Sequence, residues 1–387
     1  MKIDRFLSLD DFESAAERFL PRPLFGYIRN GVETQSSVRT NRDAFHAYAF
    51  TTRILRDISK RSIGATLLGK TYAAPFGIAP MGLAAICSYR GDLVLAAAAK
   101  AANIPMVMSG ASLIRMEEVA DANPDAWFQA YLFGEPDSIS LMLGRVRRAG
   151  FGTLVVTVDA QGRANKDNYI RCGFTTPLRP SMQLFWDGLT RPRWLAGVFL
   201  PTLLRHGMPH FENGSHVRGA PVISASAERQ FDGRSKFSWQ HIRQIRAEWE
   251  GKLVIKGILS APDALIAREH GVDAIIVSNH GGRQLDGAIT ALNILEEIVR
   301  QVPGYPVMID GGFRRGTDVM KALALGASFV FVGRPFAYAA AVAGKPGVER
   351  AIQLLSQEVS RNLAMLGYTA IDQIERDCLR RADGRPA

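Results

Sequence analysis

A histidine and an arginine lie three positions apart in residues 278–286, SNHGGRQLD, which directly follow an apolar run. A neutral imidazole can accept a proton near pH 7, so His280 is a candidate general base. The guanidinium fork of Arg283 can hold a carboxylate through two parallel hydrogen bonds. A 2-hydroxy acid needs both groups, one for the proton of its hydroxyl or α-carbon and one for its carboxylate. The alternative is a core histidine beside a surface arginine.

Glycines and arginines recur after the next two apolar runs of the chain. Glycine lets backbone N–H groups approach a phosphate closely, and arginine adds positive charge. This pattern predicts a phosphate site, whereas ordinary tight turns with solvated arginines are the alternative. The residues concerned are Asp310, Gly311, Gly312, Arg314, Gly333 and Arg334.

Three further polar residues end apolar runs earlier in the chain. Lys256 needs a partner for its charge, which an electron-rich flavin would supply, and a lysine that reaches solvent is the alternative. Asp159 is suited to orient His280 and to stabilise its protonated form, unless it only caps a helix. Tyr131 is suited to bind a substrate oxygen, unless it packs in the core with a solvated hydroxyl.

Short apolar or β-rich runs alternate with helix-like stretches from about residue 75 onward. Because parallel strands need crossover connections, this alternation predicts an α/β fold, a (β/α)8 TIM barrel in one domain over residues 1–387. An open doubly wound sheet would carry G-x-G-x-x-G after its first strand, where residues 79–82 read APMG. We expect strands near 76–80, 105–109, 126–131, 153–158, 252–256, 273–278, 305–310 and 328–332. We expect helices near 8–20, 92–102, 137–149, 261–270, 291–300, 316–325 and 347–366.

A basic, aromatic insertion of about residues 177–215 follows the fourth expected strand. Its many prolines predict irregular chain, and its apolar run Trp194–Leu200, cut by Pro201, is too short to cross a bilayer. We expect it to hold the protein on an anionic membrane surface, and a lid over the active site is the alternative. The aromatic residues expected at the lipid interface are Phe185, Trp186, Trp194 and Phe199.

Composition narrows the class of protein. The 387 residues are 47% hydrophobic and 22% charged, which indicates a globular chain. The net charge of +10 suits anionic lipids, substrates or nucleic acid, but the arginines are scattered among strand-end loops, so we expect no nucleic-acid partner. Three cysteines without metal-ligand spacing predict no metal site and a reducing compartment. An acidic N-terminus argues against a secretory signal, so we expect a cytoplasmic protein.

Residues 278–286 resemble the signature of the FMN-dependent L-2-hydroxy-acid dehydrogenases and oxidases, and the resemblance extends over about residues 20–370. It implies a barrel that binds FMN at its C-terminal face. It also implies that His280 is the base, that Asp159 orients it, and that Lys256 lies beside flavin N1 and the C2 oxygen. Arg283 and Tyr27 match contacts to the substrate carboxylate, and Tyr131 matches a tyrosine near the substrate hydroxyl. The other implied FMN contacts are Pro80, Met81, Gly82, Ser109, Gln129, Thr157, Ser278, Asp310, Gly311, Gly312, Arg314, Gly333 and Arg334.

Several positions depart from the family pattern. Lys166 replaces an arginine and keeps the charge without the fork, which weakens any role in gripping substrate. Gly82 resembles the dehydrogenases rather than the oxidases, Ala111 predicts a wider substrate pocket, and Gly26 replaces an aspartate. The insertion is most similar to that of the mandelate dehydrogenases, in which this segment docks on the membrane.

The resemblance thus implies oxidation of a lactate- or mandelate-like acid to the 2-oxo acid. Electrons would pass from reduced FMN to a membrane quinone or another carrier, on the inner face of the cell membrane. It also implies a homo-oligomer, a tetramer. An oxidase that makes H₂O₂ from O₂ is the first alternative, and a flavin-dependent isomerase without net redox chemistry is a remote one.

Overall fold

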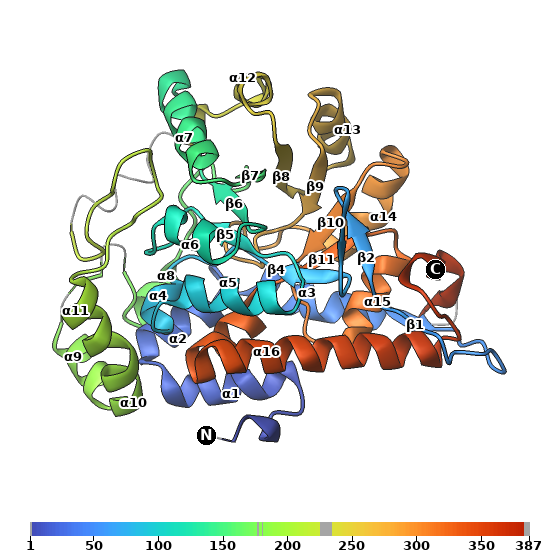
Figure 1. Ribbon diagram of the computed structural model, residues 1–387, viewed down its shortest axis with the longest axis horizontal. Coiled ribbons are helices and arrows are strands. Elements are labelled where there is room, and N and C mark those ends of the chain that lie inside the picture. The colour runs from blue at the N-terminus through green and yellow to red at the C-terminus, as the bar shows by residue number, and fades with distance from the viewer. Residues whose placement is uncertain (1, 176–177, 180, 225–233, 383–387) are drawn as a thin grey trace.

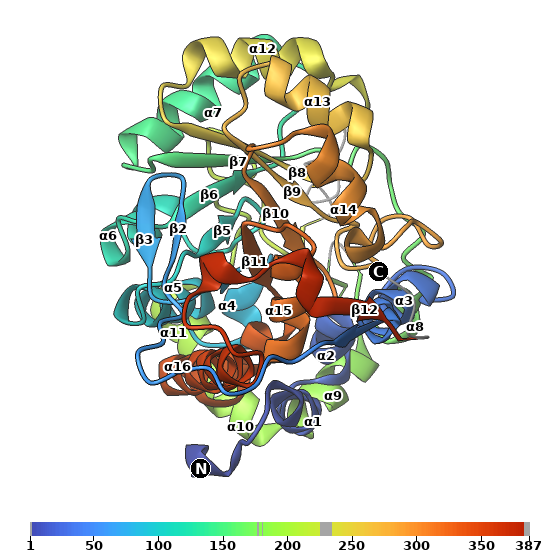
Figure 2. The same cartoon turned by 90° about the vertical axis from the view of Figure 1, so that its right-hand side faces the viewer.

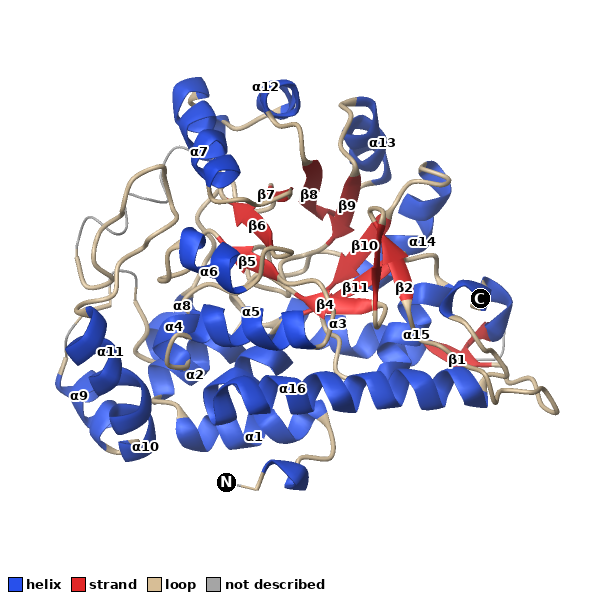
Figure 3. Cartoon of the chain, in the orientation of Figure 1, coloured by secondary structure: helices blue, strands red, loops and turns tan. Residues whose placement is uncertain are grey.

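The computed structural model describes residues 2–175, 178–179, 181–224 and 234–382 (Figure 1). Pro177 and Pro180, at the start of the expected insertion, lie outside these ranges. At the centre is a sheet of eight parallel strands, surrounded by helices (Figure 3). The strands are β4 (Phe76–Ile78), β5 (Val107–Ser109), β6 (Trp127–Ala130), β7 (Thr153–Thr157), β8 (Lys252–Ile258), β9 (Ala274–Val277), β10 (Val307–Asp310) and β11 (Phe329–Val332).

The strand order β4-β11-β10-β9-β8-β7-β6-β5 leaves β4 and β5 at the two edges. A parallel bridge between Ile78 and Met106 joins these edges, and Ile78 N donates to Pro105 O at 2.9 Å. The sheet is therefore closed, and the predicted (β/α)8 barrel is confirmed with a strand at each of the eight expected places.

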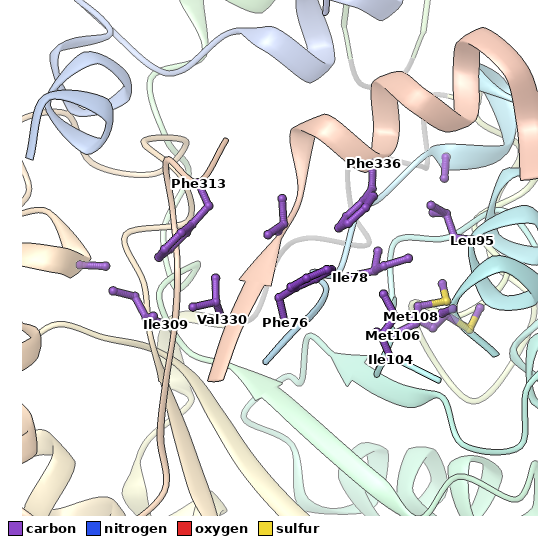
Figure 4. Close-up of a cluster of buried hydrophobic side chains, with 14 of the residues drawn as sticks. Phe76, Ile78, Leu95, Ile104, Met106, Met108, Ile309, Phe313, Val330 and Phe336 are labelled. Carbon is purple, nitrogen blue, oxygen red and sulfur yellow. The ribbon is translucent and has the colours of Figure 1, made fainter. Parts of the chain in front are cut away.

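Alternate strand residues pack into two separate cores, because both faces of a barrel strand are buried. Phe76, Ile78, Ile309 and Val330 belong to the core between strands and helices, which Phe336 also joins (Figure 4). The second core contains Val155, Val254, Ile276, Met308 and Phe331 together with Leu67 and Tyr72. The last two come from the hairpin of β2 (Ala65–Leu67) and β3 (Lys70–Tyr72), which closes the N-terminal end of the barrel.

Helices cover the outer face of the barrel. The long α16 is interrupted at Ala343 and Gly344, which have non-helical backbone angles just before Pro346, so the expected helix 347–366 is its second half. It packs against the N-terminal α1, and the two lie side by side in Figures 1 and 2. The covering helices are α5 (Gly91–Ala101), α6 (Met116–Ala122), α7 (Pro136–Arg148), α12 (Trp239–Glu248), α13 (Ala261–Glu269), α14 (Ala291–Gln301), α15 (Gly316–Ala324) and α16 (Arg334–Met365).

Shorter elements connect this frame to the C-terminal face of the barrel. The covering helices α6 and α12, and the short helices given below apart from α1, were not predicted from the sequence. A two-stranded sheet joins the N-terminal and C-terminal parts of the chain. The elements are α1 (Leu9–Phe19), α2 (Arg22–Arg29), α3 (Ser36–Asp43), β1 (Tyr48–Phe50), α4 (Ala84–Cys87), α8 (Asp167–Arg171) and β12 (Leu379–Arg381).

Most of residues 182–206 in the insertion are helical, so the prediction of irregular chain was wrong there, whereas residues 207–215 contain no helix. The helical part forms α9 (Met182–Leu189), α10 (Pro192–Trp194), a π-helical turn (Leu195–Phe199) and α11 (Leu200–His206), gathered at one end of the molecule in Figure 1. Pro192 and Pro201 lie in the first turns of α10 and α11, where proline needs no backbone N–H donor and is compatible with a helix. The number of prolines was therefore a poor guide to the secondary structure of this segment.

Trp194 is buried, which contradicts its expected place at a lipid interface. Its Nε1 donates to the carbonyl of Ile86 at 2.9 Å, and its ring stacks on Phe199 with 5.5 Å between ring centroids. Nearby, Arg191 Nε donates to Leu20 O at 3.1 Å. These contacts fasten the insertion to the body of the protein.

Replacing Gly77 should test the closure of the barrel. A Cβ at this position of β4 would lie 2.5 Å from Pro105 O and 2.9 Å from a Phe331 ring carbon. Overpacking of this kind costs about 1–3 kcal/mol, so Gly77→Ala should lower the thermal melting temperature. Gly152→Ala is the matched control, because a Cβ there meets nothing within 4 Å. Equal melting of the two variants would show that the junction of β4 and β5 is not tightly packed.

Candidate active site

A cavity of about 710 Å³ opens where the carboxyl ends of the strands meet. The structure brings most of the expected site residues to its wall. These are Tyr27, Pro80, Met81, Gly82, Tyr131, Thr157, Lys166, Lys256, His280, Arg283, Asp310, Gly311, Gly312, Arg314, Gly333 and Arg334. The remaining four, Ser109, Gln129, Asp159 and Ser278, do not line it. Asp159 and Ser278 bond to the lining residues His280 and Lys256, and Ser109 Oγ accepts from the N–H of the lining Ala111 and donates to Gln129.

His280 lies between a carboxylate and a phenol. Its Nδ1 is 2.8 Å from Asp159 Oδ1, and its Nε2 is 3.4 Å from the Tyr131 hydroxyl. Burial opposes ionisation of Asp159, but His280 and Lys256 outweigh it and hold the pKa of the carboxyl below its usual range. A charged carboxylate favours the proton on Nδ1, which leaves Nε2 free to accept a proton.

The backbone at His280 turns sharply out of β9. His280 has a φ of 57°, in the left-handed region, which costs a non-glycine residue about 1–2 kcal/mol. Its N–H donates to Ser278 Oγ at 3.0 Å, which holds the turn. Gly282 follows with a φ of 76°, and a Cβ there would lie 2.8 Å from Val38 N. The turn directs the imidazole into the cavity rather than along the strand.

Arg283 is held by tyrosine rings and by carbonyl groups. Its guanidinium carbon lies 4.9 Å from the ring centroid of Tyr27 and 5.3 Å from that of Tyr169. Its Nη1 donates to the carbonyls of Tyr27 and Ile28 at 2.8 and 3.2 Å. Within the described residues, Nε and Nη2 have no hydrogen-bond partner, so they remain available to an anionic ligand. Burial raises the pKa of Tyr27, whose hydroxyl is therefore a neutral donor.

The buried Lys256 has a carboxylate partner that was not predicted from the sequence. Its Nζ lies 3.0 Å from Asp310 Oδ2 and donates to Ser278 Oγ at 2.8 Å. Burial opposes the charge, but Asp310 and Asp159 raise the pKa of Lys256 above its ordinary value. The ammonium is consequently charged at neutral pH.

Two buried polar atoms at the strand ends fit a flavin ring. Ser109 Oγ donates to Gln129 Oε1 at 3.1 Å, which leaves Gln129 Nε2 without a partner among the described residues. Asp310 Oδ1 also lacks one. Because buried polar groups in native proteins are normally hydrogen-bonded, these atoms are available to bond a polar ligand.

Two partly buried arginines and a tight backbone turn fit a phosphate. Gly312 has a φ of 85°, and a Cβ there would lie 2.2 Å from Asn41 O. Burial, and then Arg283 among its charged neighbours, lowers the pKa of Arg334 to about 10, and burial also lowers the pKa of Arg314. Neighbouring buried cations that line one cavity are stabilised by an anion between them. Arg334 also begins α16, where helix N–H groups favour phosphate.

Sequence reasoning missed several residues of the cavity wall. Arg234 lies over the face of Tyr131, with its guanidinium carbon 4.2 Å from the ring centroid. Phe174 packs on Tyr27 with 4.7 Å between ring centroids. Neither follows a barrel strand, so no strand-end signal marked them. In the described ranges no group of three or more His, Cys, Asp or Glu side chains is arranged to hold a metal ion.

Comparison with known proteins agrees with this geometry. Residues 16–381 match the family model described as FMN-dependent dehydrogenase. (S)-Mandelate dehydrogenase of Pseudomonas putida is 37% identical over 375 residues, covering 96% of this chain and 93% of that protein. L-lactate oxidase of Lysinibacillus sphaericus is 36% identical, covering 97% and 92%. The crystal structure of the monotopic membrane protein (S)-mandelate dehydrogenase superposes with a TM-score of 0.90, at 36% identity, over 97% of this chain and all of that chain. The chain belongs to the FMN-dependent dehydrogenase family.

Proposed function

We propose that the protein oxidises an L-2-hydroxy acid to the 2-oxo acid and passes the electrons to a membrane quinone or a similar carrier. The observation that carries this proposal is one cavity that holds a base, a free guanidinium edge and a phosphate-type site. When bound, FMN supplies the two-electron oxidising chemistry. Arg314, Arg334 and Gly312 would hold its phosphate, and Gln129 and Lys256 would contact its ring. The loop of residues 80–82, with Ser109, Thr157 and Ser278, would complete the flavin site.

The side chains around the free part of the cavity divide the work on the substrate. Arg283 and Tyr27 bind the carboxylate and fix its orientation. His280 Nε2 then takes a proton from the substrate, either from the hydroxyl or from the α-carbon. Asp159, 2.8 Å from Nδ1, stabilises the imidazolium that forms. Tyr131 donates to the substrate oxygen on the same side as the base.

Replacing His280 should separate binding from chemistry. His280→Ala should keep FMN and bind substrate analogues, while anaerobic flavin bleaching by L-2-hydroxy acids slows by about 10²–10⁴-fold, the usual contribution of a positioned base. The readout is flavin absorbance in a stopped-flow instrument, with the released flavin identified by mass. Bleaching at the wild-type rate would remove His280 from the mechanism, and release of FAD would contradict the cofactor site.

Replacing Arg283 should affect capture of the carboxylate. Arg283→Ala should weaken the binding of 2-hydroxy and 2-oxo acids, because no fork remains at the end of the cavity beside Tyr27. Arg283→Lys should recover only part of the loss, since a point charge replaces a bidentate donor. The dissociation constants can be read from the perturbed flavin spectrum. Unchanged affinity and reduction rate in Arg283→Ala would contradict the clamp.

The electron acceptor distinguishes the proposed dehydrogenase from the main alternative, an oxidase that uses O₂. Relatives of this chain include both dehydrogenases and oxidases. Gly82 lies beside the substrate tyrosine, since a Cβ there would be 3.1 Å from the Tyr27 hydroxyl and 3.0 Å from Ala111 Cβ. Turnover with a dye or quinone but little peroxide in air is the result expected of the dehydrogenase. An isomerase without net redox chemistry would not need His280 and Arg283 in one cavity.

The exposed face of α9 and α11 supports membrane docking, which we also propose. Phe185, Trp186 and Leu204 are 60%, 56% and 81% exposed. Arg193 and Arg205 are exposed among them, and basic residues near anionic lipid contribute about 1 kcal/mol each. Across the described residues, the helices are too short or too polar to span a bilayer, so the surface would dock without crossing. We place it on the cytoplasmic face of the cell membrane, and the expected homo-oligomer rests on family resemblance alone.

Polar substitutions on this face should release the protein from lipid. The triple variant Phe185→Ser, Trp186→Ser, Leu204→Ser should lose flotation with anionic vesicles at low salt and keep its activity with a soluble dye. A matched control is Ile54→Ser with Leu55→Ser, two exposed apolar residues in another loop, 79% and 100% exposed. Wild-type protein that does not float would contradict docking and favour the lid.

A further inference from the structure

A second, smaller hollow lies between the insertion and the wall of the active-site cavity. Its volume is about 180 Å³, and it is found at the end of the molecule where Figure 1 draws α4 and α11. Its lining combines apolar side chains, among them Ala85, Leu113, Ile114 and Met208, with charged and hydroxyl groups. None of the reactive groups described above lies in it, so the hollow needs a separate explanation.

Helix α4 forms part of the partition between the two hollows. Ala84 lines the active-site cavity, and its neighbour Ala85 lines the second hollow. The loop after β5 divides them in the same way, with Ala111 on the cavity side and Leu113 on the other. The backbone N–H of Leu83 donates to Ala111 O at 3.3 Å, which joins the two parts of the partition. Hydride transfer needs the reacting atoms in contact, but electrons can cross a thin layer of packed protein.

The arginines that border the second hollow each have a carboxylate partner. The pairs are Arg90 with Glu118, Arg115 with Glu117, and Arg218 with Glu212. A guanidinium has five N–H donors, so in the described part of the chain each pair leaves some donors available. The hollow therefore offers hydrogen-bond donors without an excess of positive charge. This favours a neutral ligand with oxygen acceptors over an anion.

The opposite side of the second hollow is formed by α11 and leads to the proposed docking face. His206 Nε2 lies 3.1 Å from the Tyr89 hydroxyl, which fastens the end of α11 to the rest of the protein. Thr202 and His206 line the hollow, whereas Leu203 and Leu204 do not and are 37% and 81% exposed. A ligand that comes from lipid at this face would therefore reach the hollow directly behind α11.

We propose that this second hollow binds the head ring of a membrane quinone. A benzoquinone ring has two apolar faces and two carbonyl acceptors, which match the apolar wall and the guanidinium N–H groups. Sites for drug-sized ligands occupy roughly 300–1,000 Å³, so a hollow of about 180 Å³ suits a single ring. The apolar tail of the quinone would lie along Leu203 and Leu204.

The inference rests on the proposed function and gives a site to its electron acceptor. In the net step, reduced FMN loses two electrons and two protons, and the quinone gains two electrons and two protons to become a quinol. The electrons cross the partition at α4, and the protons exchange with water. The oxidised flavin is then ready for the next molecule of hydroxy acid.

A bulky side chain in the second hollow tests this inference. Thr202→Phe should fill it, while Leu203→Phe, at the next position of α11 and outside the hollow, and Thr202→Ala are the matched controls. The FMN of the holoenzyme is photoreduced without oxygen and mixed with ubiquinone-1, a quinone with a short tail. Reoxidation should slow by about tenfold or more in Thr202→Phe, because the ring is excluded from its pocket. Reoxidation by ferricyanide and flavin reduction by substrate should be unchanged, and both controls should match the wild type.

The other outcomes of this experiment are also informative. Equal reoxidation by ubiquinone-1 in Thr202→Phe and wild type would overturn the inference, since the quinone would then reach the flavin by another route. A parallel loss with ferricyanide would also overturn it, because the change would have disturbed the flavin site itself. Loss of vesicle flotation with normal ubiquinone-1 reoxidation would assign the hollow to a lipid. If ubiquinone-1 did not reoxidise the wild-type flavin, the proposed acceptor would fail as well.

Occupation of the active-site cavity provides an independent test. Phenylacetate carries a carboxylate for Arg283 but no 2-hydroxyl group, and its binding can be followed in the flavin spectrum. Because the quinone site is separate, reoxidation of photoreduced wild-type holoenzyme by ubiquinone-1 should continue at saturating phenylacetate. Inhibition that rises in parallel with phenylacetate occupancy would place the quinone in the active-site cavity and overturn the inference, while the proposed oxidation of a hydroxy acid would stand.

Discussion

The buried ammonium of Lys256 organises the site electrostatically. Lys256 lies on β8, between Asp159, which follows the neighbouring β7, and Asp310, which ends β10. It helps to lower the pKa of Asp159, and it forms an ion pair with Asp310. Asp159 in turn bonds to His280 at the end of β9. One charge network therefore runs across four consecutive strands of the closed barrel. Because those strands are parallel, their polar carboxyl ends converge at one rim, and a displacement of one strand would leave a buried charge unpaired.

The N-terminal helices complete what the barrel begins. Carbonyls at the C-terminal end of α2 receive hydrogen bonds from Arg283 and Arg334. Asp286 binds the first residues of α3, since its carboxylate accepts hydrogen bonds from Ser36 N and Ser37 N at 3.3 and 2.8 Å. Burial opposes its charge, but these donors hold the pKa of Asp286 well below its usual range. Segment 278–286 thus has two roles. His280 and Arg283 line the cavity, and Asp286 at its end attaches the N-terminal helices to the barrel.

The sequence could predict the strands and their terminal residues because both are local signals. Each strand is a short apolar run, and the barrel places whatever follows it at the site, which is why His280, Arg283 and Arg314 were found. The contact of Asp286 with residue 37 spans 249 positions, and nothing local marks it. Arg234 was missed for the same reason, since it reaches the cavity from a loop before α12. The helices of the insertion were missed because proline was treated as a breaker where it begins a helix.

The proposed membrane-docking surface of the insertion lies near the opening of the cavity. Trp194 and Arg191 donate hydrogen bonds to the carbonyls of Ile86 and Leu20, which hold the insertion against the rest of the protein. Other apolar residues of α9 and α11 remain exposed to solvent. Arg179, three residues before α9, lines the cavity, and the insertion therefore borders its opening. Docking through α9 and α11 would bring that opening close to lipid, where a quinone can meet the reduced flavin. A charged hydroxy acid does not partition into the bilayer. The basic side chains at the opening would therefore draw it from water along the membrane surface, while the electrons leave to an acceptor dissolved in the lipid.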